Sequence, residues 1–100
     1  MNLMEIPSMA LSHLCEEFQV LELYVFGSVV SGEFSSTSDL DFIVKFDPDY
    51  PGGAFEQFMG FQEALERHFD RRVDLLTLKP FRNPIFQSEV NRTKKLIYAA

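Results

Sequence analysis

The stretch FGSVVSGEFSSTSDLDFIV, residues 26–44, decides the fold because it joins two strand-like segments through a glycine- and serine-rich loop. The segment before it, VLELYVF at residues 20–26, is rich in aliphatic and aromatic residues, and Gly27 ends it. After the loop, every second residue from Leu40 to Phe46 is apolar, which predicts a strand with one buried face. The remaining chain must therefore supply helices that cover these strands.

The rest of the sequence alternates helical and strand-like patterns. In chain order, the expected elements are a helix at 8–18, a strand at 20–26, a short helix at 28–34, a strand at 39–46, a helix at 54–69, a strand at 72–78, a helix at 84–92 and a strand at 95–98. This order predicts one α/β (α+β) domain over residues 1–100, with a small mixed sheet of about four strands flanked by helices. The loop at 27–38 can return the chain antiparallel, so a purely parallel sheet is not required.

Composition restricts the classes of function. A chain of 100 residues with 46% hydrophobic and 24% charged residues is typical of one globular domain. The net charge of -6 and the pI near 4.7 argue against direct nucleic-acid binding. No apolar run reaches membrane-spanning length, and we expect no membrane contact. The single cysteine, Cys15, falls in a helical apolar pattern and is predicted to be a small buried hydrophobe in a reducing, cytoplasmic setting.

Three aspartates are candidate metal ligands. Asp39 and Asp41 share one face of the predicted strand, and Ile43 makes that face apolar immediately beyond them. Asp74 lies inside VDLLTL, a run otherwise suited to a buried strand, where an ionised carboxylate is costly unless it is paired. Neighbouring carboxylates repel, and a hard cation such as Mg²⁺ removes that repulsion. The alternatives are a solvated outer face for the first two acids and, for Asp74, an ion pair with Arg71 or Arg72 or a strand edge facing water.

The pair Gly27-Ser28 is a candidate phosphate-binding turn. Glycine at a strand end lets the backbone approach a ligand closely, and a following helix N-terminus offers free N–H groups. The alternative is a plain turn in which Ser28 caps a helix. Gly32, taken by itself, is a turn residue.

The helix expected at 54–69 carries an apolar stripe. The residues expected along that stripe are Phe55, Phe58, Phe61, Gln62, Leu65 and Phe69. Because Phe58, Met59 and Phe61 span a broad arc, either core packing or a protein interface could use them.

Together these residues resemble a known family. Gly27-Ser28, followed after ten residues by Asp39-Leu40-Asp41, resembles the GS-x10-DxD signature of the DNA polymerase β-like nucleotidyltransferase superfamily. Gly32 and Ser38 match the wider pattern, and Asp74 falls where the superfamily places its third carboxylate. The length and element order are similar to the minimal nucleotidyltransferases (MNT), the antitoxins of HEPN/MNT toxin–antitoxin pairs.

The resemblance implies a specific activity: transfer of AMP from ATP to a tyrosine hydroxyl of a HEPN ribonuclease toxin, which silences the toxin within a hetero-oligomer. Asp39 and Asp41 would hold two Mg²⁺ ions, and Asp74 would complete the metal site and act as the base. Gly27 and Ser28 would hold the β- and γ-phosphates, and the matching Gly32 and Ser38 belong to the same nucleotide-binding loop.

One position departs from the family. Many minimal members carry arginine before the second glycine, where this chain has Ser31. Lys45, Lys79 or Arg82 could replace that cation. Two other functions stay open: an inactive antitoxin that acts by binding its toxin, and a nucleotidyltransferase that acts on a small molecule.

Overall fold

The computed structural model describes residues 8–27, 39–79 and 82–100. Its elements in chain order are helix α1 (Met9–Glu17), strands β1 (Val20–Phe26) and β2 (Leu40–Phe46), helix α3 (Ala54–Phe69), strand β3 (Val73–Thr77), helix α4 (Pro84–Thr93) and strand β4 (Lys95–Ala99). Every element predicted within these ranges is present, and each of its ends lies within one residue of the prediction. The short helix predicted at 28–34 lies outside the described residues.

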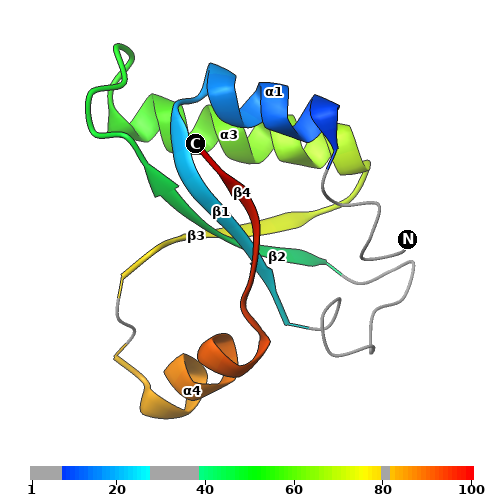
Figure 1. The fold of residues 1–100 in the computed structure, drawn as a ribbon, viewed down its shortest axis with the longest axis vertical. Coiled ribbons are helices and arrows are strands. Elements are labelled where there is room, and N and C mark those ends of the chain that lie inside the picture. The colour runs from blue at the N-terminus through cyan, green and yellow to red at the C-terminus, as the bar shows by residue number, and fades with distance from the viewer. Residues whose placement is uncertain (1–7, 28–38, 80–81) are drawn as a thin grey trace.

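The strands form one mixed sheet in the order β3-β2-β1-β4 (Figure 1). β1 runs antiparallel to both β2 and β4, and β2 runs parallel to β3. A parallel pair needs a crossover connection, and α3 supplies it between β2 and β3. The predicted mixed sheet flanked by helices is therefore confirmed.

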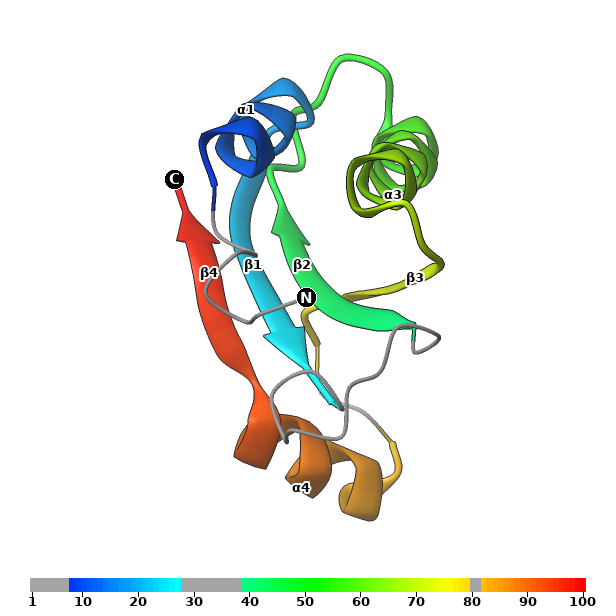
Figure 2. The same cartoon turned by 90° about the vertical axis from the view of Figure 1, so that its right-hand side faces the viewer.

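The main core lies between one face of the sheet and the helices α1 and α3, which lie side by side (Figure 2). Leu11 and Cys15 of α1 and Phe61 and Leu65 of α3 are buried there. The sheet contributes the alternate residues of its strands to this core: Leu23, Val25, Leu40, Phe42, Val44, Val73 and Leu75. Burial of Cys15 raises the pKa of its thiol to about 12, so the side chain is the buried hydrophobe that the sequence predicted.

A second, smaller core lies on the opposite face of the sheet. Val90 of α4 packs there against Phe26 of β1 and Ile43 of β2, and all three are buried. Ile43 follows Asp41 on the same face of β2, so this face does turn apolar directly beyond the acid, as predicted. α4 therefore anchors to the sheet beside the acidic end of β2.

Capping hydrogen bonds define the starts of two helices, and one buried side-chain amide joins α3 to its neighbours. Ser8 accepts a hydrogen bond from the Leu11 N–H (3.1 Å) at the start of α1, and Asn83 accepts one from the Ile85 N–H (2.9 Å) at the start of α4. Gln57 of α3 is buried, and its amide donates to the carbonyl oxygens of Phe18 (2.8 Å) and Asp47 (3.2 Å). That side chain ties the end of α1 and the end of β2 to the same helix.

The predicted apolar stripe of α3 is wrong at one residue. Phe55 is 80% exposed, because the buried side of the first helical turn is taken by Gln57. Phe61 is fully buried, and Phe58 packs edge-on against Phe46. Met59 is 47% exposed, so only part of the broad arc belongs to the core.

Within the described ranges, no helix combines the length and the apolar character needed to span a membrane.

Candidate active site

Two of the three predicted acids lie opposite each other on the parallel strands β2 and β3. The register pairs Asp41 with Asp74, directly after the pair Leu40 and Val73. Residues opposite each other on parallel strands point to the same side of the sheet, so the two carboxyl groups lie on one face. Asp41 is half-buried, whereas Asp74 is exposed because β3 is an edge strand. The water-facing edge considered for Asp74 is therefore correct, and it lies beside the other acid.

The surroundings of Asp41 disfavour its negative charge. The pKa of this carboxyl is raised to about 6, chiefly by burial, and then by the charge and hydrogen bond of Asp74 and the charge of Asp39. Carboxylates that repel one another in a partly buried site are stabilised by a cation, and Mg²⁺ takes oxygen ligands of this kind. The donor set at this point of the sheet therefore fits a hard divalent ion.

Gly27 lies at the end of β1 against the same acid. Phe26 is paired with Asp41 across β1 and β2, and Gly27 follows with φ +80°. A Cβ at Gly27 would lie 2.7 Å from Oδ2 of Asp41, closer than such atoms approach. Both the backbone conformation and the space require glycine here. The Gly27 N–H donates to Oγ1 of Thr93 at 3.2 Å.

A pocket of about 440 Å³ surrounds these groups. It is lined by Phe26, Gly27, Asp41, Gln62, Asp74, Leu75, Leu76, Phe86 and Glu89. Its walls combine three carboxyl groups with apolar side chains, including Phe86 of α4, which meets Phe26 edge-on at 6.2 Å between ring centroids. A site of this kind can hold a ligand that carries both an apolar ring and groups that bind metal.

The structure brings together Gly27, Asp41 and Asp74 from the predicted set. Asp39 lies one residue before β2 and is half-buried, and its charge reaches Asp41. In residues 8–27, 39–79 and 82–100, no three acidic, histidine or cysteine side chains form a ready metal-ligand cluster. The three-aspartate ligand set therefore stays a prediction.

Other predicted positions contribute differently. Ser28, Gly32 and Ser38 of the nucleotide loop, and Ser31 with them, lie outside the described residues. The candidate replacement cations Lys45, Lys79 and Arg82 are exposed, and none of them lines the pocket. Lys45 instead lies 3.8 Å from Glu22 in a surface ion pair.

The sequence analysis missed the contribution of α4. Phe86, Glu89 and Thr93 lie next to the pocket or to Gly27, yet their sequence pattern is that of any short amphipathic helix. Only the pairing of β1 with β4 brings α4 back to the start of the glycine turn. No sequence signal marks Thr93 for this role, because its burial follows only from the fold.

A glycine turn beside paired aspartates on a mixed sheet defines the class of this protein. The sequence profile of the family described as the nucleotidyltransferase domain matches residues 8–98, and the chain belongs to that family.

Named relatives and solved structures agree with this assignment. The chain is 39% identical over 79 residues to the protein adenylyltransferase MntA of Thermococcus cleftensis. The aligned region covers 76% of this chain and 77% of that protein. A solved structure described as a candidate minimal nucleotidyltransferase is 29% identical, with a TM-score of 0.69 and 95% of each chain covered. A third similarity is to a complex of a tri-AMPylated Shewanella oneidensis HEPN toxin with its MNT antitoxin. That similarity is of fold alone, at 17% identity and a TM-score of 0.62, over 98% of this chain and 74% of the other.

Proposed function

We propose that this chain is an antitoxin-type protein adenylyltransferase. It transfers AMP from ATP to a tyrosine hydroxyl of a partner HEPN ribonuclease toxin and so neutralises the toxin. The observation that carries the proposal is the Asp41–Asp74 pair beside Gly27, in a pocket with an apolar wall. The relative named as a protein adenylyltransferase and the AMPylated HEPN complex with the same fold support the choice of donor and acceptor.

The three aspartates have different proposed roles according to their positions. Asp39, Asp41 and Asp74 would hold two Mg²⁺ ions, which neutralise charge on the triphosphate and on the attacking oxygen. Asp74 is exposed at the sheet edge and can accept the proton of an incoming hydroxyl. The hydroxyl oxygen then bonds to the α-phosphorus, and pyrophosphate leaves with the electrons of the broken bond.

Nucleotide binding is assigned to the glycine turn. Gly27 ends β1 against Asp41, where only a residue without a side chain lets the backbone come so close. Ser28, Gly32 and Ser38 follow in the sequence, and their hydroxyls and backbone N–H groups would suit the β- and γ-phosphates.

The acceptor fits the other half of the pocket. Phe26, Leu76 and Phe86 give it an apolar wall next to the exposed Asp74, and an aromatic ring carrying a hydroxyl matches this combination. The acidic chain suits a protein partner rather than a nucleic acid. Transfer would take place in the cytoplasm, within a hetero-oligomer of antitoxin and toxin.

A second candidate function is neutralisation by binding alone. It is favoured by Ser31 in place of the family's arginine and by the exposure of Phe55 on α3. In that case the protein would bind its toxin without modifying it.

The test uses purified protein with Mg²⁺, ATP labelled on the α-phosphate and extract that contains the natural partner. The wild-type chain should label one protein band, and Asp41→Asn should abolish the labelling. Asp49→Asn is the matched control, because it removes one exposed carboxylate outside the pocket and should leave labelling unchanged. A partner that co-purifies with wild-type protein but takes up no label would favour the binding antitoxin.

A further inference from the structure

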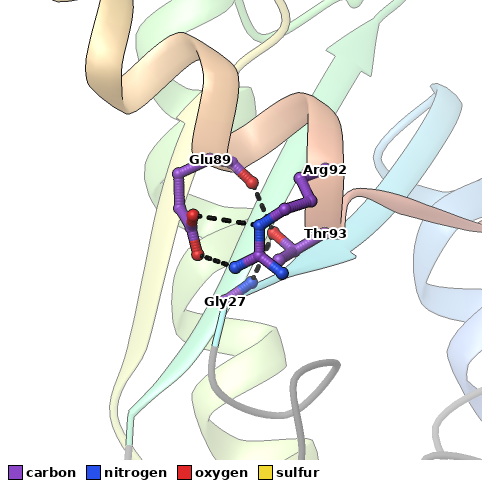
Figure 3. A network of polar contacts seen from close by, with 4 residues as sticks. All are labelled: Gly27, Glu89, Arg92 and Thr93. Atoms are coloured by element: carbon purple, nitrogen blue, oxygen red, sulfur yellow. Dashed lines mark hydrogen bonds and ion pairs between the residues drawn. The ribbon is translucent and has the colours of Figure 1, made fainter.

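Thr93, the last residue of α4, is buried and joins that helix to the glycine turn. It is only 3% exposed, and its hydroxyl makes two hydrogen bonds (Figure 3). The hydroxyl donates to the Glu89 carbonyl oxygen at 2.9 Å, one helical turn earlier, which is common for threonine in helices. The same oxygen accepts from the Gly27 N–H at 3.2 Å, across a sequence separation of 66 residues. This second bond lies outside the helix and needs a separate explanation.

The position of Thr93 is fixed by its own helix. Val90, one turn before Thr93, is buried against Phe26 and Ile43 of the sheet. In the same helical turn Arg92 pairs with Glu89 (2.5 Å), and Thr93 is the residue whose side chain bonds to the Gly27 N–H (Figure 3). A rigid helix end therefore presents a hydroxyl to one backbone N–H.

That N–H belongs to the residue on which the site depends. Gly27 has φ +80°, and its Cα lies so close to Asp41 that a Cβ would come within 2.7 Å of Oδ2. A small rotation of the Gly27 peptide would change its gap to Asp41. The hydrogen bond from Gly27 to Thr93 restricts that rotation, since a buried N–H without a partner is costly.

We propose that Thr93 is a positioning residue for the nucleotide site. Its hydroxyl holds the Gly27 backbone against Asp41, at the point where the proposed nucleotide site meets the acid. This inference rests on the proposed function, and it gives a role to a residue of α4 that lies outside the pocket lining.

The informative variants are Thr93→Val and Thr93→Ser. Valine keeps the shape of threonine and removes the hydroxyl, whereas serine keeps the hydroxyl. Thr93→Val should raise KM for ATP about five- to tenfold, because the hydrogen bond acts on the nucleotide side of the site. Its kcat with saturating ATP should change less than KM does, and Thr93→Ser should restore wild-type kinetics.

A control is needed for loss of stability. Ser8→Ala removes the N-cap bond of α1 to Leu11, on the far side of the sheet from the pocket. It should lower Tm as Thr93→Val does, yet leave KM for ATP unchanged. Equal changes in KM for both variants would mean that Thr93 serves stability only.

Two readouts separate this inference from the proposed function. The first is the affinity for ATP measured by calorimetry, and the second is hydrogen exchange of the Gly27 amide measured by NMR. The inference predicts weaker ATP binding and faster Gly27 exchange in Thr93→Val than in the wild type and in Thr93→Ser. If the wild-type chain binds ATP but labels no partner, the proposed function fails while these readouts still decide the role of Thr93. Unchanged affinity and unchanged exchange in Thr93→Val would overturn the inference, even in an active enzyme.

Discussion

A methyl group on Gly27 would lie 2.7 Å from Oδ2 of Asp41, so the turn and the acid are neighbours only because residue 27 has no side chain. The glycine end of the motif and its acidic end are therefore in contact in the fold, although residues 28–38 separate them in the sequence.

Gly27→Ala should abolish nucleotidyl transfer. The new Cβ must displace Asp41 or the turn, and a positive φ costs an alanine about 1–2 kcal/mol in addition. Gly53→Ala is the matched control, because Gly53 has φ +87° but nothing lies within 4 Å of the point that its Cβ would occupy. Both variants should lose stability in urea unfolding, and only Gly27→Ala should lose transfer of the labelled nucleotide. Equal activity in the two variants would contradict the contact with Asp41.

The stability of the metal-free protein should fall as pH rises through the titration of Asp41. Its pKa is raised in the folded state from 3.8 to about 6, so folding favours the protonated form. The contribution is fully present below about pH 4, is lost between pH 4 and pH 6, and is absent above that range. Each pKa unit corresponds to about 1.4 kcal/mol, and solvent screening at this partly exposed carboxyl reduces the expected loss to about 1–2 kcal/mol.

The check is urea unfolding in EDTA at a series of pH values, for wild type and for Asp41→Asn. Other groups titrate in both proteins, so the difference between the two unfolding free energies reports Asp41. Asp41→Asn should become the more stable of the two above pH 6. Adding Mg²⁺ at neutral pH should recover stability in the wild type and much less in the variant. If the difference between the two unfolding free energies did not change with pH, the raised pKa of Asp41 would be contradicted.

Asp74→Asn should separate catalysis from nucleotide binding. Asp74 lies at the exposed edge and is assigned to the incoming hydroxyl, so its loss should lower kcat by about a hundredfold or more. The dissociation constant for ATP should change by a smaller factor than in Asp41→Asn, whose side chain touches the glycine turn. Single-turnover kinetics with a preformed complex measure the rate of transfer, and calorimetric titration measures the dissociation constant for ATP. An Asp74→Asn variant with normal kcat would exclude Asp74 as the base.

Gln57→Leu tests the fold independently of the site. The substitution leaves the carbonyl oxygens of Phe18 and Asp47 without their amide donor and should cost about 1–3 kcal/mol. Glu63→Ala on the exposed side of the same helix removes only a surface ion pair with Arg67 and should cost no more than about 0.5 kcal/mol. Urea unfolding compares the two. A similar cost for both would mean that the Gln57 bonds add nothing to stability.

The elements were predictable because their signals are local. Alternation of apolar residues indicated β2, helical spacing of apolar residues indicated α1 and α3, and Gly27 marked the end of β1. Phe55 was misassigned because hydrophobic spacing counts it as core, whereas Gln57 occupies the buried position and satisfies two backbone carbonyls there. The spacing of hydrophobic residues does not identify a polar side chain that is buried because it makes hydrogen bonds.

The site was predictable only in part. Asp41 and Gly27 are marked by the motif, and Asp74 by its charge inside an apolar run. The direct opposition of Asp41 and Asp74 depends on the register of a parallel pair, which the packing of α3 on the sheet sets. Phe86, Glu89 and Thr93 reach the site through the tertiary arrangement of α4, and no short-range pattern encodes that contact.

The hydrogen bond between Gly27 and Thr93 also determines when the nucleotide site can form during protein synthesis. The ribosome adds Thr93 66 residues after Gly27, which at about 5–20 residues per second is roughly 3–13 seconds later. Until then the aspartates already exist, but the turn beside them has no hydroxyl to hold it. A nascent chain that carries all three acids would therefore still be a poor nucleotide binder. The chain would become able to bind nucleotide only after α4 has been synthesised, although α4 contributes no residue to the motif that runs from Gly27 to Asp41.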